Sequence, residues 1–204
     1  MSSHHVVRNE QEPALFIIEP KACDFAIVQE LLEWNPTIIV LESAVETVLS
    51  WGIKIDVVIC HLENFDAMKK LTTKQSPVEI LAMDSDLIAN GVNYLKHRKH
   101  KTVSLLANFE QAIELPTKQT ALELVLYNQN FKAFWVKEGV WKKWASKGTN
   151  FKIYVPNNNF EARYTNLVLD KGQNHGFWHL RTERDDFVEI DTQNQPFWLF
   201  EQLC

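Results

Sequence analysis

The chain has 204 residues, of which 46% are hydrophobic and 23% are charged, and this composition is that of a folded globular protein. Its formal net charge of −5 at pH 7 argues against a surface that binds nucleic acid or an anionic membrane. The cysteines, Cys23, Cys60 and Cys204, show no CxxC or zinc-ligand spacing, which favours free thiols in a reducing compartment. No run approaches the ~20 apolar residues of a membrane span. We therefore expect a cytoplasmic protein with no nucleic-acid or membrane partner.

Short apolar runs alternate with helical patterns over residues 12–137. Strands are expected at 14–19, 37–42, 56–62, 79–84, 102–108 and 132–136. Helices are expected between them, at 23–34, 43–51, 64–74, 85–100 and 117–129. Strands that are apolar on both faces and separated by helices predict a parallel sheet covered on both sides. The first domain is thus predicted to be an α/β, nucleotide-binding-like domain.

The pattern changes in residues 138–204, which form the second predicted domain. Short alternating runs rich in aromatic and β-branched residues are separated by Asn, Gly, Asp and Pro clusters. These runs lie at 151–157, 160–170, 176–182, 186–191 and 196–202. They predict a C-terminal all-β sandwich or half-barrel, with residues 138–148 as a bridge that contains a helical turn.

Polar side chains follow successive strands of the predicted parallel sheet. Ligands on such a sheet bind outside the carboxyl ends of the strands, so these side chains are expected to converge on one site. They are Glu42 and Ser43, then His61, Glu63 and Asn64, then Asp84, Ser85 and Asp86, and finally Asn108 and Glu110. Helix capping is the alternative role for single members of the set, above all for Ser43, Asn64 and Ser85.

The carboxylates of this set suggest a metal. If Glu42, Glu63 and Asp86 face one crevice, they are expected to hold Mg²⁺, which prefers oxygen ligands and shares its shell with the phosphates of a nucleotide. The sequence contains neither GxxxxGK[ST] nor GxGxxG, so no P-loop or dinucleotide motif supports a nucleotide site. By contrast, "KHRKH" at 96–100 is expected to close a helix, where positive charge complements the helix dipole.

The segment "LESAVETVLSWGIKIDVVICHLEN" resembles the nucleotide-binding region of thiamine pyrophosphokinases. That family has a strand ending in (A/C)DG(A/G), a helix, GI-x-PD, a strand and then G-D-(F/L)-D-S. The "SDL" at 85–87 stands where the family has T-D-(F/L). The resemblance spans most of the chain, because the family also has a C-terminal β-sandwich. It implies a homodimer, with active sites between subunits, that transfers pyrophosphate from ATP to the hydroxyl of thiamine.

The motifs are altered at several positions. Gly52, Ile53 and Asp56 keep the GI-x-PD frame, and Ile55 replaces its proline. Elsewhere the changes fall on the family's metal and phosphate positions. Glu42 and Ser43 stand at the aspartate and glycine of DG; Cys60, His61, Glu63 and Asn64 stand at the glycine, the two aspartates and the serine of G-D-(F/L)-D-S; Leu62, Ser85 and Asp86 fit.

The resemblance assigns roles to these residues. Glu63 and Asp86 are the expected catalytic residues, with Glu42 as a further magnesium ligand. The expected nucleotide-binding residues are Glu42, Ser43, His61, Asn64 and Ser85. Imidazole is a poor ligand for Mg²⁺, so His61 weakens a magnesium site, and Mn²⁺ or Zn²⁺ bound by His61 and Glu63 is an alternative.

The second domain supplies candidate substrate contacts. Aromatic rings stack on heteroaromatic cations such as thiamine. Trp178 and Trp198 are the expected contacts because they lie in the domain that the family uses for thiamine.

Three functions remain open at this point. The first is an ATP-dependent thiamine pyrophosphokinase. The second is a catalytically degenerate homologue that binds a nucleotide or thiamine-like ligand without turnover. The third is a pterin pyrophosphokinase of the archaeal 6-hydroxymethylpterin type, whose motifs are similar.

Overall fold

The computed structural model describes residues 13–113, 115, 122–129, 131–155, 162–174 and 176–203. The chain divides into two compact units, Met1–Gln129 and Asn130–Cys204. The boundary expected from the sequence, at residue 137, lies later in the chain. The strand β7 (Phe131–Val136) pairs antiparallel with β14 (Phe197–Gln202), and both strands belong to the second unit.

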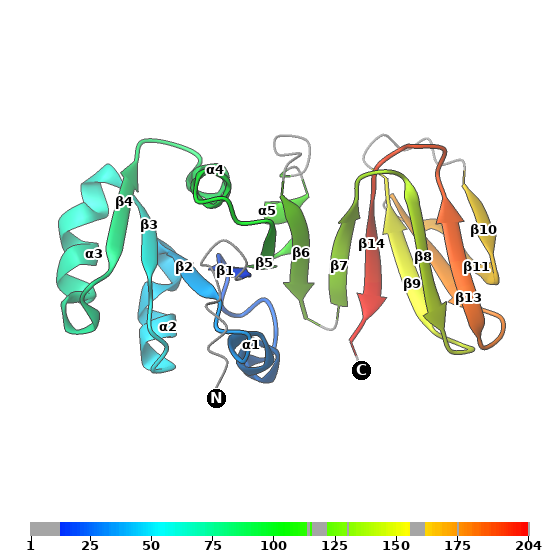
Figure 1. Ribbon diagram of the computed structural model, residues 1–204, viewed down its shortest axis with the longest axis horizontal. Helices are drawn as coiled ribbons and strands as arrows, with labels where there is room; N and C mark the ends of the chain where they lie inside the picture. The colour runs from blue at the N-terminus through cyan, green and yellow to red at the C-terminus, as the bar shows by residue number, and fades with distance from the viewer. Residues whose placement is uncertain are drawn as a thin grey trace, which may run out of the picture. The chain divides into compact units, whose positions relative to one another are not determined.

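The first unit contains a parallel sheet with the strand order β6-β5-β1-β2-β3-β4 (Figure 1). Its strands are β1 (Ala14–Ile17), β2 (Thr37–Leu41), β3 (Val57–His61), β4 (Glu79–Met83), β5 (Thr102–Leu106) and β6 (Glu123–Asn128). Every residue of β1 is fully buried, as expected for a central strand covered on both faces. The predicted α/β fold class is confirmed for this unit.

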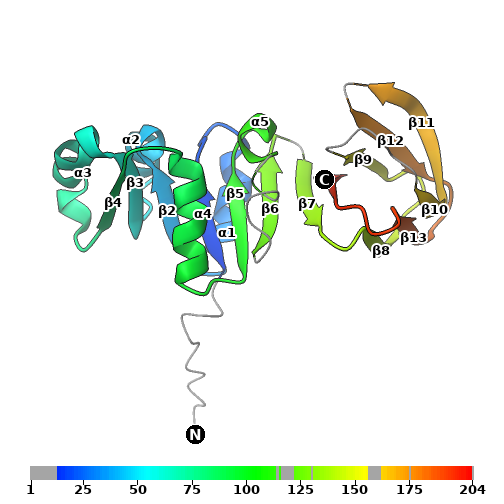
Figure 2. The ribbon, with the colours of Figure 1, turned by 90° about the horizontal axis from the view of Figure 1, so that it is seen from above.

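Four helices of the first unit follow the predicted positions, namely α1 (Phe25–Leu32), α2 (Val45–Ser50), α3 (Phe65–Leu71) and α4 (Leu87–His97), whereas the short α5 (Phe109–Ala112) was not predicted. The 3₁₀ turn η2 (Glu42–Ala44) precedes α2, and η3 (Leu62–Asn64) precedes α3. A third 3₁₀ turn, η4 (Thr73–Gln75), follows α3. In Figure 2, α4 covers the face of the sheet opposite to α1 and α2.

Close packing of α4 on the sheet depends on a glycine. A Cβ atom built at Gly91 would lie 2.6 Å from the ring of Phe16 in β1. The missing side chain therefore lets the helix approach the central strand.

One predicted helix is wrong. The helical interpretation of 117–129 fails over its described part, because residues 123–128 form β6, which pairs in parallel with β5. Leu122, Leu124 and Leu126 alternate along the chain, and all three are buried. This period of two is typical of a strand, and the parallel neighbour β5 supplies the backbone partners. Residues 116–121 lie outside the described part.

The second unit is antiparallel throughout. One sheet has the order β11-β12-β9-β14-β7, and a smaller sheet has the order β10-β13-β8. The remaining strands are β8 (Val140–Ala145), β9 (Asn150–Tyr154), β10 (Arg163–Thr165), β11 (Leu167–Asn174), β12 (Phe177–Thr182) and β13 (Asp186–Asp191). The buried core joins residues of both sheets, for example Ile153 and Leu199 with Val188 and Ile190. The predicted sandwich is confirmed.

The predicted bridge at 138–148 is not helical. Residues 140–145 form β8, which pairs antiparallel with β13. The alternation of Trp141 and Lys142 along the segment suits a strand with one half-buried and one exposed face. Among the helices that the structure describes, none has the length and apolar character that a membrane crossing requires.

The GI-x-x-D frame has a structural role. Gly52 adopts φ +72°, which disfavours any residue with a Cβ, and it ends the turn after α2. Asp56 then accepts a hydrogen bond from the Ile38 N–H through Oδ2 at 2.8 Å, and its own N–H donates to the Ile38 carbonyl at 3.1 Å. These bonds fix the start of β3 against β2, so Asp56 does not lie at the carboxyl edge of the sheet.

Candidate functional site

The expected site lies where β2 and β3 end. The two strands are parallel neighbours, with Leu41 opposite Ile59. Each strand runs directly into a 3₁₀ turn, so Glu42 after β2 and His61 at the end of β3 lie next to each other. This register brings together two of the positions that the sequence placed in the site.

Glu42 joins the two strand ends. Its Oε2 accepts a hydrogen bond from the His61 backbone N–H at 2.9 Å and another from Asn64 Nδ2 at 3.0 Å. Its Oε1 lies 3.9 Å from His61 Nε2. The Glu42 side chain is only 16% exposed, whereas that of His61 is 43% exposed. One oxygen of this carboxylate is therefore used to hold the turn after β3.

Glu63 and Ser43 project from these turns into solvent. Both residues are exposed, and no hydrogen bond to either side chain is found within the described residues. Ser43 lies inside η2 and does not cap α2, whose N-cap residue is Ala44. Asn64 occupies the N-cap position of α3 without making a side-chain cap bond, and its amide nitrogen donates to Glu42 instead. Capping is thus not the role of Ser43 or Asn64.

Cys60 is not part of an open loop. It is fully buried in β3, and burial, with a smaller contribution from Glu42, raises the pKa of its thiol. A buried neutral thiol is a small apolar group and a poor nucleophile.

Asp86 organises the start of α4. It is the N-cap residue, adopts φ 39° and accepts a hydrogen bond from the Ala89 N–H through Oδ1 at 3.1 Å. Ser85, expected as a cap, lies one residue earlier, and its carbonyl accepts from Asn90 Nδ2 at 2.6 Å. Asp84, Ser85 and Asp86 are all exposed.

Two of the three expected magnesium ligands, Glu42 and Asp86, are engaged in other contacts in this structure. Within the described ranges, no three His, Cys, Asp or Glu residues form a group that could hold a metal ion. Glu42 already accepts two hydrogen bonds, and Asp86 caps a helix. His61 adds a nitrogen ligand, which Mg²⁺ disfavours. The magnesium set of Glu42, Glu63 and Asp86 stays a prediction.

The strand order identifies further residues that the sequence did not. In the order β6-β5-β1-β2-β3-β4 the direction of winding reverses between β1 and β5, and the carboxyl ends at such a switch point form the usual ligand crevice. Glu19 follows β1, and its Oε1 accepts from the Lys21 N–H at 3.0 Å. Asn128 at the end of β6 donates to the Ala107 carbonyl at 3.0 Å. The alternation of helices and strands along the sequence does not reveal the order of the strands in the sheet. The sequence therefore did not indicate that Glu19 and Asn128 lie at this edge.

Asn108 was expected at this edge, and it caps α5. Its side chain and that of Gln111 form a reciprocal capping box. Glu110 lies in the first turn of the same helix and is exposed.

The two tryptophans expected to contact substrate differ in environment. Trp198 is fully buried in β14, with its ring centroid 5.5 Å from that of Trp135. It presents no surface to a ligand and is a core residue. Trp178 is half-buried and lines a cavity of about 320 Å³ within the second unit, together with Tyr164 and Leu169.

The first unit is thus an open parallel α/β unit with its polar groups at the carboxyl edge, and the second is an antiparallel sandwich with an aromatic cavity. This combination defines a class of two-part proteins in which an open parallel α/β unit is followed by an antiparallel sandwich.

Solved structures identify the fold within this class. A thiamin pyrophosphokinase from Geobacillus thermodenitrificans is similar with a TM-score of 0.70 and 6% identity over 94% of this chain and 98% of that one. The enzyme from Candida albicans gives a TM-score of 0.68 and 11% identity over 95% of this chain and 90% of that one. The thiamine pyrophosphokinase of Bacillus subtilis gives a TM-score of 0.65 and 11% identity, covering 94% and 99%. The chain therefore has the fold of thiamine pyrophosphokinases. No protein-family model and no curated protein sequence matches the chain.

Proposed function

We propose that this protein binds a nucleotide or thiamine-like ligand at the carboxyl edge of the first unit and does not transfer pyrophosphate. The strand order supports a ligand at this edge, because open parallel sheets bind ligands outside the carboxyl ends of their strands, and the similar structures are thiamin pyrophosphokinases. We infer the absence of turnover from the hydrogen bonds of Glu42. Its Oε2 accepts bonds from the His61 N–H and the Asn64 amide, so this oxygen is not free to bind a metal.

The loss of turnover without loss of binding has an energetic reason, which is the neutralisation of phosphate charge. Transfer of phosphoryl-type groups depends on positioning and on cations that offset the charge of the phosphates. A site that does not hold the metal loses several kcal/mol of transition-state stabilisation, which corresponds to roughly three orders of magnitude in rate. Binding needs less, since backbone N–H groups and side-chain amides at strand ends can still contact the ligand.

A calorimetric titration tests the binding part of the proposal. ATP and thiamine are titrated separately into the full-length protein, first with Mg²⁺ and then with EDTA. We expect at least one of them to bind, with an affinity that EDTA does not change. Absence of heat with both ligands, or ATP binding that EDTA abolishes, would contradict the proposal.

An active thiamine pyrophosphokinase is the second candidate, and the similarity over nearly the whole chain favours it. The variant Glu42→Asp/His61→Asp/Glu63→Asp restores the carboxylates that the resemblance implies. Under the main proposal this variant gains Mg²⁺-dependent ATP binding that the natural chain lacks. Equal Mg²⁺ dependence in both proteins would favour the second candidate. Homodimer formation follows from the same resemblance, and analytical ultracentrifugation at micromolar concentration tests it.

A further inference from the structure

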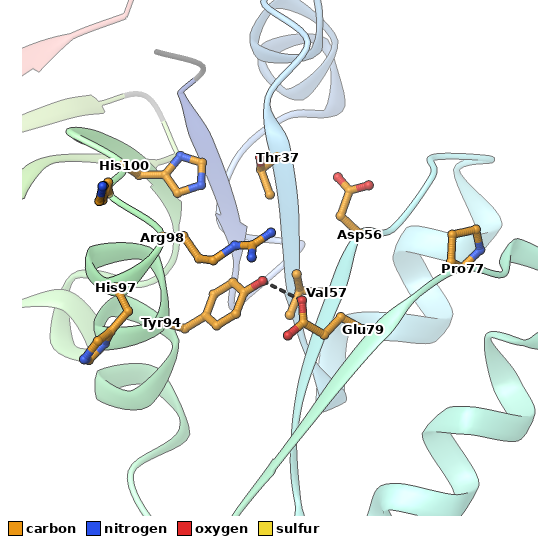
Figure 3. A pocket seen from close by; sticks show the side chains of 10 residues that line it. Thr37, Asp56, Val57, Pro77, Glu79, Tyr94, His97, Arg98 and His100 are labelled. Carbon is orange, nitrogen blue, oxygen red and sulfur yellow. Dashed lines mark hydrogen bonds between the residues drawn. The ribbon is translucent and has the colours of Figure 1, made fainter. Parts of the chain in front are cut away.

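A cavity of about 670 Å³ lies in the first unit at the opposite edge of its sheet, where the strands begin. The starts of β3 and β4 form one side, and the last turn of α4 forms the other (Figure 3). A strand of five residues, such as β3, separates the two edges by about 13 Å. The cavity is therefore distinct from the site at the carboxyl ends.

The sheet side of the cavity carries negative charge. Asp56 precedes β3, and only its Oδ2 accepts the hydrogen bond from the Ile38 N–H. Glu79 begins β4, and its Oε2 accepts a hydrogen bond from the Tyr94 hydroxyl at 2.7 Å. In both carboxylates the second oxygen takes no part in these bonds. Burial, together with the hydrogen bond to Glu79, raises the pKa of Tyr94 to about 12, so the phenol donates at neutral pH.

The helix side carries positive charge. The guanidinium carbon of Arg98 lies 5.9 Å from the centroid of the Tyr94 ring, which is the outer limit of a cation–π contact. Within the part of the chain that the structure describes, Arg98 forms no ion pair with a carboxylate. Figure 3 shows Arg98 and Tyr94 extending from the α4 side toward Glu79, with Asp56 on the far side. Arg98 and the two carboxylates thus line one cavity without forming an ion pair with each other among the described residues.

The arrangement selects a ligand with both charges. A lone anion would lie close to two carboxylates and to the negative end of the α4 dipole. A lone cation would lie close to Arg98. A molecule that carries an ammonium and a carboxylate satisfies both sides, since the ammonium donates to Asp56 and Glu79 while the guanidinium binds the carboxylate through paired hydrogen bonds. Val57, which is only 2% exposed, contributes an apolar surface to the cavity wall.

We propose that this cavity is a second binding site, which takes a small zwitterion of the α-amino-acid class. Its volume lies within the range of ~300–1,000 Å³ that is typical of small-molecule sites. The proposal goes beyond the function of the carboxyl edge and does not depend on it, because the residues involved lie at the starts of β3 and β4 and at the end of α4.

The test uses ¹⁵N-labelled full-length protein. Each of the twenty standard amino acids is added in turn at 10 mM, and backbone amide shifts are followed at Val57, Glu79 and Arg98. We expect at least one amino acid to shift these amides in a saturable way, while the amides of Glu42 and His61 at the carboxyl edge stay in place. If none of the twenty shifts the cavity amides, the proposal is wrong.

Derivatives and variants then test the charges. For the amino acid that binds best, we expect the N-acetyl derivative, which lacks the ammonium, and the amide, which lacks the carboxylate, each to bind at least about tenfold more weakly. Arg98→Gln and Glu79→Gln should each weaken the binding of the zwitterion to a similar extent. Lys96→Gln is the matched control, because Lys96 is an exposed cation on the same turn and does not line the cavity. Equal affinity for the N-acetyl derivative, or an unchanged affinity in Arg98→Gln, would overturn the proposal; the ¹⁵N spectrum of each variant verifies its fold.

Discussion

Replacement of Glu42 by alanine removes the link between the ends of β2 and β3. The carboxylate accepts hydrogen bonds from the His61 N–H at 2.9 Å and from Asn64 Nδ2 at 3.0 Å, and its side chain is only 16% exposed. A hydrogen bond to a charged group contributes about 1.5–3 kcal/mol. Because both bonds share one oxygen and lie near the surface, we expect Glu42→Ala to lower the free energy of unfolding by about 2–3 kcal/mol. Glu42→Gln keeps a neutral acceptor and should cost about 1 kcal/mol.

Urea denaturation followed by circular dichroism measures the loss. Glu63→Ala is the control, since Glu63 is exposed two residues beyond His61 and a surface substitution of this kind changes stability by less than about 0.5 kcal/mol. Hydrogen exchange at the His61 amide gives a local readout, because this N–H loses its acceptor in Glu42→Ala. Equal effects of Glu42→Ala and Glu63→Ala, with an unchanged exchange rate at His61, would mean that Glu42 does not hold the turn after β3.

The remaining predictions concern packing and pH. Gly91→Ala places a methyl group 2.6 Å from the Phe16 ring, so we expect a loss of about 1–3 kcal/mol in urea denaturation, and a variant as stable as the natural chain would contradict the packing of α4. Trp198→Ala should lower the free energy of unfolding by about 3–5 kcal/mol, because the side chain is fully buried. A change in ligand affinity without a loss of stability would instead support a substrate contact. The folded-state pKa of Tyr94, about 12, is above the ordinary value of 10.0, so its contribution to stability is complete below pH 10 and is lost as the pH rises toward 12. Denaturation at several pH values checks this loss, which should be smaller in Glu79→Gln.

Much of the fold follows from patterns in the sequence. The strands β1 to β5 and the helices between them are predicted because buried apolar runs and helical periodicity are local properties. The strand β6 was missed because the apolar residues of "ALELVLYN" suit both the period of a helix and the period of a strand. Pairing with the parallel neighbour β5 makes the segment a strand. The bridge at 138–148 was missed for a similar reason, since its pairing with β13 lies far away in the sequence.

The site was predictable only in part. The sequence placed Glu42 and His61 at one edge, and the β2–β3 register confirms that they are neighbours. It did not reveal that Glu42 accepts a bond from the His61 backbone, because this contact depends on the geometry of two 3₁₀ turns. The charged cavity at the other edge was also hidden, since Glu79 and Arg98 carry no motif and come together only through the crossover of α4.

If this chain has the thiamine pyrophosphokinase fold and binds its ligand without pyrophosphate transfer, as we propose, it should form very little AMP. The most direct measurement is AMP formation by the purified natural chain with ATP and thiamine in Mg²⁺ or Mn²⁺, beside an active thiamine pyrophosphokinase. We predict thiamine-dependent AMP formation at least about three orders of magnitude slower than in the active enzyme. AMP formed at a comparable rate, with an equal amount of thiamine diphosphate, would contradict the proposal.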